Sequence, residues 1–346
     1  MAVVKSNAYG HGLDQCVEIL REKADWFGVN ALPEALRVRE SAPKTPVLVM
    51  GRQDERDYKL IPPGSAIALV VSSLQEIQAL AEYNPGTPFH FKVDTGLGRL
   101  GADADHAPRV LEFLAERPEL PWAGLMTHFA NVEDVTDQEY ALAQMKEFGR
   151  YRELAGKAAG SRKLLVHAAA SAPAMLLPES RLDLVRCGIA LYGLWPSRET
   201  RISLHAAPGP LPELRPVMRW VTRIAHLKTV PAGSGIGYGC TYRAQSETRL
   251  AVLPVGYFEG YERSLSNRSH VVIRGRRARL LGRVSMNMIA VDVSHIEQVA
   301  QGDEAVLIGV DEGESMSAEE LAELTGTINY EVVTRVQGDL PRIVVE

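Results

Sequence analysis

Short apolar segments recur through the first half of the chain, at the spacing of strands that are buried on both faces. Helix-compatible stretches at 13–23, 73–83, 107–117 and 138–159 lie between several of them. Strand alternating with helix is typical of a parallel sheet whose two faces are covered. We therefore expect eight strands, within residues 2–5, 26–30, 46–50, 66–71, 89–94, 123–129, 164–170 and 182–194.

The number of expected strands indicates the type of sheet. Eight strands in about 190 residues favour a (β/α)8 TIM-type barrel, in which each strand is followed by a helix on the outside. An open α/β sheet of unspecified strand order is the alternative. In either case, side chains that carry chemistry should stand at the C-terminal ends of the strands.

A change of composition after Leu194 indicates a second domain. Residues 195–216 are rich in proline, charge and turn-forming residues, which is typical of a domain boundary. Short β-leaning segments follow, and the one clear helix is expected at 317–326, between a capping serine and a glycine. We therefore expect a barrel domain at residues 1–205 and a smaller, mainly β domain at 206–346.

Composition and charge narrow the class of protein. Hydrophobic residues make up 46% and charged residues 23%, and the net charge is −5, so no basic excess favours nucleic acid as a partner. The cysteines Cys16, Cys187 and Cys240 are far apart and odd in number, so we expect neither a disulfide framework nor a metal site. Without a secretory signal or a long apolar segment, we expect a cytoplasmic protein that does not enter a membrane.

Polar residues stand where the expected strands end. Lys5 ends the first strand, Lys92 the fifth, His128 the sixth and His167 the seventh, and Arg186 lies in the eighth. A lysine in a site of low dielectric has a lowered pKa, and its neutral amine can form a Schiff base with a carbonyl. A solvated lysine at the edge of the sheet is the alternative for any one of these lysines.

A Schiff-base lysine suggests pyridoxal phosphate, whose phosphate needs hydrogen-bond donors. The hydroxyls of Tyr9 and Ser171 and the backbone at Gly188 and Ile189 are candidate donors. Phosphate sites also occur on barrels that bind no pyridoxal cofactor, so the residues alone leave this open.

Eight motifs, in the same order along the chain, closely resemble those of bacterial alanine racemase, a fold-type III pyridoxal-phosphate enzyme. They are AVVKSNAYGHG, KVDTGLGRLG, MTHFAN, RCGIALYGL, GYGCTYRA, PVGYFEGY, GRVSMNM and GTINYEVVTRV. The family's fold is a barrel followed by a β domain, as expected above. The resemblance implies a homodimeric isomerase that interconverts L- and D-alanine for peptidoglycan, with an active site shared between subunits.

The resemblance also implies the residues of catalysis. Lys5 carries pyridoxal phosphate and is one catalytic base, and Tyr238 of the partner subunit is the other, because inversion needs a base on each face of the substrate. Arg186 faces the pyridine nitrogen, and because a guanidinium keeps its protons, the ring becomes a weaker electron sink. The further cofactor contacts that the resemblance implies are Tyr9, His128, Ser171, Gly188, Ile189 and Tyr330.

Substrate contacts follow from the same motifs. Arg99 reaches the substrate carboxylate and the cofactor's phenolic oxygen, and Lys92 matches a lysine that is often carbamylated in the family. The backbone of Met286 helps to bind the carboxylate, and Tyr257 and Tyr330 line a narrow entrance. A charged corridor further out, for which a solvated surface role is the alternative, would comprise Glu133, Arg263 and Arg283.

The sequence departs from the family pattern in three places. Ala170 stands where asparagine is usual, and Asn287 stands where aspartate is usual. The motif around Lys5 begins about thirty residues earlier in the chain than in the family, so we expect one strand and one helix of the usual fold to be missing. These departures leave two alternatives: a racemase of other amino acids, and a cofactor-binding protein with little activity. Arg186 and Tyr238 argue against a fold-related decarboxylase of basic amino acids.

Overall fold

The computed structural model describes residues 1–133, 137–206 and 211–345. It divides into two compact units. The N-terminal unit comprises Met1–Ala8 with Leu13–Leu214, and the C-terminal unit comprises Tyr9–Gly12 with Arg215–Glu346. No helix in the described part of the chain is long and apolar enough to cross a membrane.

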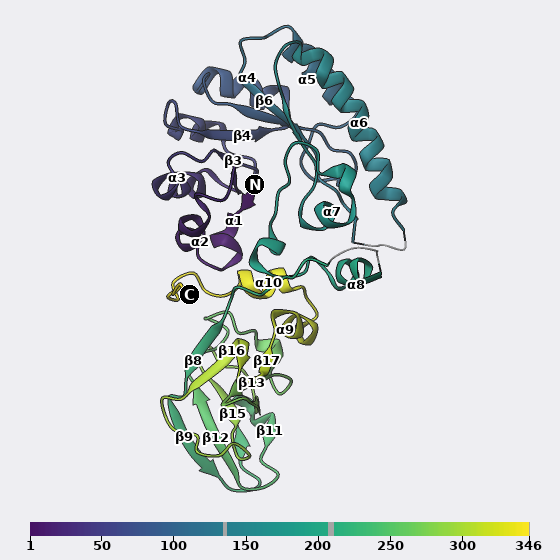
Figure 1. Cartoon of the computed structure of the whole chain (residues 1–346). Coiled ribbons are helices and arrows are strands. Elements are labelled where there is room, and N and C mark those ends of the chain that lie inside the picture. The colour runs from purple at the N-terminus through teal and green to yellow at the C-terminus, as the bar shows by residue number, and fades with distance from the viewer. Residues whose placement is uncertain (134–136, 207–210, 346) are drawn as a thin grey trace. The chain divides into compact units, whose positions relative to one another are not determined.

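The N-terminal unit is built on a parallel sheet in which every strand pairs with the next one along the chain (Figure 1). Phe27 lies opposite Val47, and Val47 lies opposite Ile67, so the register continues across neighbouring strands. Seven of the eight expected strands are thereby confirmed. They are β1 (Ala2–Val3), β2 (Phe27–Val29), β3 (Val47–Val49), β4 (Ile67–Val71), β5 (Phe89–Lys92), β6 (Trp122–Met126) and β7 (Leu165–His167).

The eighth expected strand, at 182–194, is wrong as a regular strand. Its first part is an irregular segment that bonds to both ends of the sheet: the N–H of Asp183 donates to Val166 O at 3.1 Å, and the N–H of Val3 donates to Cys187 O at 2.9 Å. Its second part turns into η3 (Ile189–Tyr192), which ends at the left-handed Gly193. The expected barrel is therefore confirmed in seven regular strands and one irregular segment.

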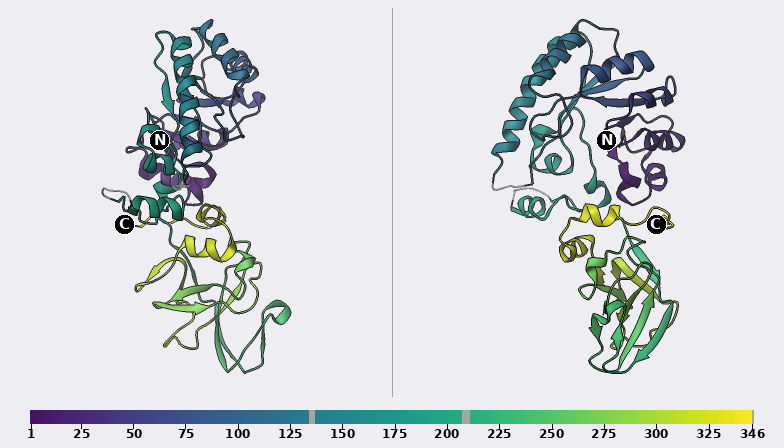
Figure 2. Two further views of the ribbon diagram at one scale, coloured as in Figure 1. Left: turned by 90° about the vertical axis from the view of Figure 1, so that its right-hand side faces the viewer. Right: turned by 180° about the vertical axis from the view of Figure 1, so that it is seen from behind.

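Helices alternate with the strands and lie on the outer side of the sheet (Figures 1 and 2). Several bury one apolar face, as α5 does with Ala107, Val110, Leu111 and Leu114. The right-handed helices of this unit are α2 (Leu13–Leu20), α3 (Leu32–Ser41), α4 (Leu74–Tyr83), α5 (His106–Ala115), α6 (Glu139–Ala159), α7 (Ser171–Leu176) and α8 (Arg198–Ala206), with the short turns η1 (Glu55–Leu60) and η2 (Pro178–Ser180).

The segment labelled α1 (Lys5–Tyr9) is a left-handed turn. Ser6, Asn7 and Ala8 have φ of 53–54° and ψ of 45–53°, and Tyr9 also has a positive φ of 53°. Each L-residue in this conformation costs about 1–2 kcal/mol relative to a right-handed one. The chain therefore adopts a strained backbone directly after Lys5.

The C-terminal unit is mainly β, as expected. One antiparallel sheet has the order β15-β12-β9, and a second has the order β14-β13-β16-β17 with β8 paired to β16. The strands are β8 (Trp220–Arg223), β9 (His226–Val230), β10 (Gly235–Ile236), β11 (Tyr242–Arg243), β12 (Thr248–Leu253), β13 (His270–Ile273), β14 (Arg276–Arg279), β15 (Ile289–Asp292), β16 (Glu304–Asp311) and β17 (Glu314–Met316), with the turns η4 (Tyr238–Cys240) and η5 (Arg263–Leu265).

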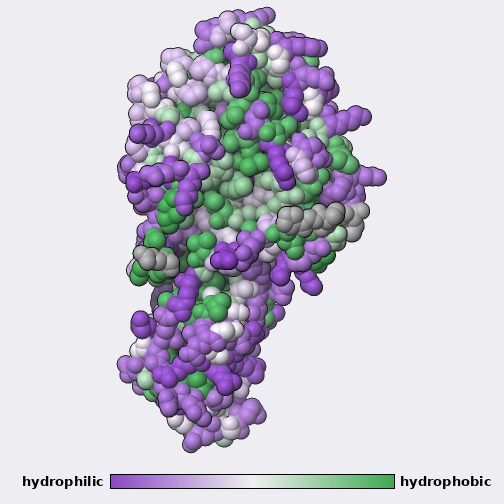
Figure 3. Space-filling view, in the orientation of Figure 1, coloured by the Kyte–Doolittle hydropathy of each residue, from purple (hydrophilic) through white to green (hydrophobic). Residues whose placement is uncertain are grey.

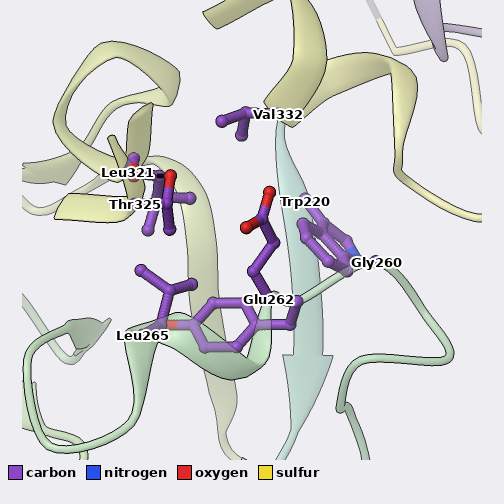
Figure 4. Close-up of a pocket in the computed structure, with 8 residues that line it drawn as sticks. Trp220, Gly260, Glu262, Leu265, Leu321, Thr325 and Val332 are labelled. Atoms are coloured by element: carbon purple, nitrogen blue, oxygen red, sulfur yellow. Dashed lines mark hydrogen bonds between the residues drawn. The ribbon is translucent and has the colours of Figure 1, made fainter. Parts of the chain in front are cut away.

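Two helices complete the C-terminal unit. The helix expected at 317–326 is confirmed as α9 (Ala318–Thr325): the Ser317 side chain accepts the N–H of Glu320, and Gly326 is left-handed. A second helix, α10 (Asn329–Thr334), follows. Between α9, α10 and β8 lies a cavity of about 10 Å³ (Figure 4), which holds at most one water molecule and is far too small for an amino acid.

Residues 9–12 pack within the C-terminal unit, although they follow directly on the turn after β1. A Cβ atom on Gly10 would lie 1.9 Å from the carbonyl oxygen of Val333, so only glycine fits at this contact. The guanidinium of Arg342 donates to Gly10 O at 2.9 Å from Nη2. The segment after the left-handed turn is therefore fixed by α10 and the C-terminal tail.

The buried hydroxyl of Tyr192 provides a test of how the eighth segment holds β1. It donates to Val3 O at 2.8 Å. We expect Tyr192→Phe to lower the free energy of unfolding by about 1–3 kcal/mol, because it removes a buried hydrogen bond. Urea unfolding at matched protein concentration measures this. In Tyr83→Phe, which removes a hydroxyl without a hydrogen bond to any described residue, the loss should stay below about 0.5 kcal/mol. Equal losses in both variants would contradict the assignment.

Candidate active site

Lys5 lies at the C-terminal end of β1, where the sheet places its first polar side chain. Burial and, to a smaller extent, the charge of Arg99 lower the pKa of Lys5, and Glu34 opposes the shift. Burial also lowers the pKa of Lys92, at the end of β5, to about 8, with further contributions from Arg99 and Arg186. The direction of the shift at Lys5 agrees with the expectation of an amine with a lowered pKa at the end of the first strand.

Arg186 is buried in the N-terminal unit, and its guanidinium is surrounded by acceptors from β6, β7 and the loops that follow them. Nη1 bonds to His167 Nδ1 at 2.7 Å. Nη2 lies 3.0 Å from His128 Nδ1, 2.9 Å from Thr127 O and 2.6 Å from Ala168 O. Among the described residues, Nε has no hydrogen-bond partner, and no carboxylate forms an ion pair with this arginine. Burial lowers the pKa of Arg186 to about 10, which leaves it charged at neutral pH.

Hydrogen bonds from Arg186 determine the tautomers of His128 and His167 and, through His167, the tautomer of His90. Because a guanidinium only donates, the Nδ1 atoms of His128 and His167 must accept, so both rings are neutral with the proton on Nε2. His167 Nε2 then donates to His90 Nδ1 at 2.8 Å. Burial, followed by the charge of Arg186, lowers the pKa of His128 to about 2 and that of His90 to about 3. The rings of His128 and His167 therefore act as neutral acceptors toward the buried cation, and His90 accepts from His167.

The candidate phosphate donors meet beside η3. Ser171, the first residue of α7, accepts the N–H of Gly188 at 3.1 Å through its hydroxyl oxygen. The N–H of Ile189 has no acceptor in the described part of the chain. Ala170 is the N-cap residue of α7 and provides no side-chain cap. The hydroxyl of Ser171 and the amide of Ile189 therefore suit an anion, and the asparagine usual at position 170 would add one polar group there.

Arg99 lies on a loop that follows β5. Hydrogen bonds within the loop fix its conformation: Asp94 Oδ1 accepts the N–H groups of Gly96 and Leu97 at 2.9 and 2.8 Å. The buried Gln144 of α6 braces the same loop: its Nε2 donates to Thr95 Oγ1 at 3.3 Å. Arg99 itself is exposed and makes no ion pair with the described residues, so its guanidinium is available to an anionic ligand.

Gln144 and His90 are positioning side chains that the sequence did not reveal. Gln144 Nε2 also donates to His128 O at 3.3 Å, and its Oε1 accepts the N–H of Ala130 at 2.9 Å. His90 lies inside β5, a strand whose alternation offers no sign of a polar partner. The only available signal was a polar residue within an apolar segment, which does not identify what it contacts.

The other predicted residues stand on neighbouring loops of the C-terminal unit. The N–H of Tyr257 donates to Ser285 O at 3.1 Å, which holds the Tyr257 loop against the loop that carries Met286. A Cβ on Gly237 would lie 3.2 Å from the N of Arg283, so the Tyr238 turn adjoins the second of these loops. Tyr238 is 73% exposed in the single chain.

Asn287 has a partner that accounts for its departure from the family pattern. Its Nδ2 donates to Glu259 Oε1 at 2.7 Å, and Glu259 Oε2 accepts the N–H of Gly256 at 2.7 Å. The pair joins the Tyr257 loop to the Met286 loop. An aspartate at position 287 would place a second carboxylate against Glu259, whereas asparagine supplies a donor.

The remaining predicted residues lie in the same two units. Tyr9 and Tyr330 of the C-terminal unit have ring centroids 6.2 Å apart, and burial raises the pKa of Tyr9 to about 12. Glu133 belongs to the N-terminal unit, where burial raises the pKa of its carboxyl. Arg263 and Arg283 are exposed on the C-terminal unit. The structure thus brings the predicted residues together in two groups, one on each unit.

The described residues contain no group of three or more side chains placed to hold a metal ion, and the three cysteines are free.

Comparison with known proteins identifies the family of both halves of the chain. Residues 1–196 match the family described as alanine racemase, N-terminal domain, and residues 217–344 match alanine racemase, C-terminal domain. Alanine racemase of Leptospira interrogans is 40% identical over 100% of this chain and 89% of its own length. Alanine racemase of Desulfovibrio desulfuricans is 40% identical over 99% of this chain and 90% of its own length.

Solved structures agree with the sequence comparison. Alanine racemase of Bacillus anthracis with bound L-Ala-P has a TM-score of 0.86 at 33% identity, and the match covers 97% of this chain and 85% of that one. Alanine racemase of Streptomyces coelicolor has a TM-score of 0.87 at 31% identity, with coverage of 99% and 90%. Both domain families, in the same order and over nearly the whole chain, show that this protein belongs to the alanine racemase family of isomerases.

Proposed function

We propose that this protein is a cytoplasmic, pyridoxal-phosphate-dependent racemase that interconverts L- and D-alanine and supplies D-alanine for peptidoglycan. Pyridoxal phosphate is the cofactor of the family, and when bound it withdraws electrons from the substrate Cα and so acidifies the Cα hydrogen. The observation that carries the proposal is that one barrel has both Lys5, an amine with a lowered pKa at the end of β1, and the buried cation of Arg186 in its irregular eighth segment.

The residues of the N-terminal unit fit this cofactor. Lys5 supplies the amine for covalent attachment, and Ser171 with the amide of Ile189 would hold the phosphate, while the amide of Gly188 orients the Ser171 hydroxyl. Arg186 Nε, which has no partner among the described residues, would face the pyridine nitrogen. Because every acceptor around Arg186 is neutral, the guanidinium keeps its protons and leaves the pyridine nitrogen unprotonated. That limits charge delocalisation and favours prompt return of the proton to Cα. His128 would pack beside the ring, and Tyr9 and Tyr330 of the C-terminal unit are proposed as further contacts.

Arg99 would bind the substrate carboxylate, and Lys92 would hold Arg99 in place. Arg99 is exposed and without an ion pair, so a carboxylate can bind it directly. Lys92 has a pKa of about 8, so a fraction of its side chain is the neutral amine near neutral pH. A neutral amine can add to carbon dioxide and lose one proton, which gives a carbamate. We propose that this anion is the partner that holds Arg99 in place.

The second base would come from another copy of the chain. Tyr238 is exposed in its own unit, beside four exposed apolar side chains on the two adjacent loops, Tyr257, Phe258, Met286 and Met288. Charged and polar side chains cover most of the face of this unit that Figure 3 shows. An exposed apolar cluster of this size favours a protein interface. We propose a homodimer in which Tyr238 faces the partner's cofactor and Tyr257 narrows the entrance. Glu133, Arg263 and Arg283 would line a charged corridor outside it.

The proposal names alanine as the substrate. An entrance lined by tyrosines favours a small side chain, which supports alanine. Ala170 and the Asn287–Glu259 pair alter the polar groups near the proposed cofactor and substrate contacts. Assays on L-alanine, L-serine and L-lysine, with the product detected by a D-amino-acid oxidase, discriminate the proposal from its alternatives. Turnover of lysine or serine above alanine would indicate another racemase, and bound cofactor without turnover would indicate a carrier.

The role of Lys5 is tested by Lys5→Ala. We expect loss of the absorbance of covalently bound cofactor and a fall in racemisation of at least about 10³-fold, because both the attachment point and one base are removed. Lys163→Ala, which removes an exposed lysine of the same unit, serves as the control and should leave both unchanged. Normal turnover by Lys5→Ala would overturn the assignment.

The role of Tyr238 is tested by isotope exchange in Tyr238→Phe. In deuterated water, one enantiomer should still exchange its Cα hydrogen through Lys5. Exchange of the other enantiomer and the interconversion itself should both fall about 10²-fold, because one face has lost its base. NMR of each enantiomer measures the exchange, and Tyr242→Phe on the following strand is the control. A small and equal decrease for both enantiomers would count against a base at this position.

The Asn287–Glu259 contact is tested by Asn287→Asp. Two carboxyl groups in contact raise the pKa of one of them, so the variant keeps a shared proton and a hydrogen bond at low pH and loses both as the pH rises. We expect the KM for alanine, relative to the original protein, to increase from about pH 6 to about pH 9. In Asn287→Ala this ratio should not depend on pH. A ratio in Asn287→Asp that is constant with pH would show that the contact does not hold the substrate loops.

A further inference from the structure

The chain leaves β1 in a conformation that L-residues avoid. Ser6, Asn7, Ala8 and Tyr9 all have φ near 53°, and none of them is glycine. Such a backbone persists only where its surroundings hold it, and strain of this kind concentrates at functional sites. Because the turn begins directly after Lys5, the contacts that hold it also fix the backbone from which the Lys5 side chain extends.

The carboxylate of Glu34 is one of these contacts. Its Oε1 accepts the N–H of Ser6 at 2.6 Å, from a position 28 residues away in the chain. Its Oε2 accepts the N–H groups of Asn30 and Ala31, at 2.8 and 3.2 Å. One carboxylate therefore joins the left-handed turn to the segment between β2 and α3.

Glu34 is itself held on a rigid part of the barrel. It lies in the first turn of α3, which buries Leu32, Ala35 and Val38. The N–H of Leu32 donates to Gln53 Oε1 at 2.9 Å, and Gln53 Nε2 donates to Asn30 O at 3.1 Å. The position of the carboxylate is thus set by the barrel and not by the turn that it contacts.

The other contacts of the turn are made by the side chain of Asn7 and by the backbone. Asn7 Oδ1 accepts the N–H of Leu13 at 2.9 Å, and the N–H of Ala8 donates to Val4 O at 2.9 Å. Ser6 is the residue next to Lys5, and its N–H has the Glu34 carboxylate as its acceptor. Glu34 is therefore the side chain that restrains the backbone nearest to the lysine.

We propose that Glu34 is a positioning residue for Lys5, which it holds by bracing the left-handed turn against α3. The inference rests on the proposed function of Lys5 and deepens it. Glu34 acts through the N–H of Ser6 on the backbone that carries the amine. Its negative charge also acts on Lys5 in the opposite direction to that of Arg99.

Glu76 offers a matched control in the same barrel. It lies in the first turn of α4, and its Oε2 accepts the N–H of Ser72 at 2.7 Å and the hydroxyl of Ser73 at 3.3 Å. Both glutamates thus receive donors at the start of a helix. Only Glu34 also reaches the turn after Lys5, so the two positions separate helix capping from the proposed positioning.

Substitution of Glu34 should release the Ser6 contact in two ways. In Glu34→Gln the side-chain carbonyl oxygen can accept the two N–H groups before α3. The amide NH2 group, which is a donor, then faces the N–H of Ser6, so the contact with Ser6 is lost. In Glu34→Ala all three bonds are lost. Glu76→Gln and Glu76→Ala make the corresponding changes at α4.

The first experiment measures hydrogen exchange by mass spectrometry in the cofactor-free protein. We expect amides of the segment 4–10 to exchange at least tenfold faster in both Glu34 variants than in the original protein. In the Glu76 variants this segment should exchange at the original rate, while amides around 72–76 exchange faster. Unchanged exchange of the segment 4–10 in both Glu34 variants, or equal acceleration in the Glu76 variants, would overturn the proposal.

The second experiment uses the protein loaded with pyridoxal phosphate. We expect the Glu34 variants to release the cofactor at least tenfold faster and to lose at least tenfold in kcat, with KM for alanine changed less than threefold. The Glu76 variants should keep both values. Original kcat and release rate in the Glu34 variants would refute the proposal. Absence of a covalent cofactor at Lys5 in the original protein would instead refute the proposed function, and the exchange experiment distinguishes these two failures.

Discussion

The structure depends on one buried positive charge, the guanidinium of Arg186. Burying a charge is costly unless hydrogen bonds replace its water, and no carboxylate among the described residues pairs with it. The carbonyl oxygens of Thr127 and Ala168 and the Nδ1 atoms of His128 and His167 take that role. The ends of β6 and β7 are therefore arranged around the cation, and the two rings are held in single tautomers.

The uncompensated cations give this end of the barrel its chemical character. Burial is the largest cause of the lowered pKa of Lys92 and of Lys5; Arg99 and Arg186 add to it at Lys92, and Arg99 adds to it at Lys5. A region with this balance attracts anions, and both a phosphate and a carboxylate are anions. Burial, and after it these positive charges, thus lower the pKa of both amines, and the same charges favour anionic ligands.

Sequence patterns predicted the elements that have a local pattern of hydrophobic residues. Seven parallel strands could be found because strands buried on both faces are continuous apolar segments, and Lys5 and His128 could be placed because they end such segments. The prediction of a regular eighth strand was wrong because this segment makes only isolated backbone bonds to β1 and β7 and then turns into η3. Contacts between distant residues had no local signal: His90 meets His167 across 77 positions and Glu34 meets Ser6 across 28. The places of Tyr238 and Met286 came only from the family resemblance.

The segment 9–12 gives the two units a link beyond the single peptide connection at residues 214 and 215. The chain passes from the barrel into the C-terminal unit after Ala8 and returns to the barrel at Leu13. It enters the C-terminal unit for the second time at Arg215. A barrel fragment ending at Leu214 would therefore carry four residues whose packing partners, Val333 and Arg342 among them, lie on the other fragment. Because these four residues follow the turn that bears Lys5, the halves of this chain are not interchangeable modules. Swapping the β domain for that of a relative also replaces the packing partners of the segment that follows Lys5 and its turn.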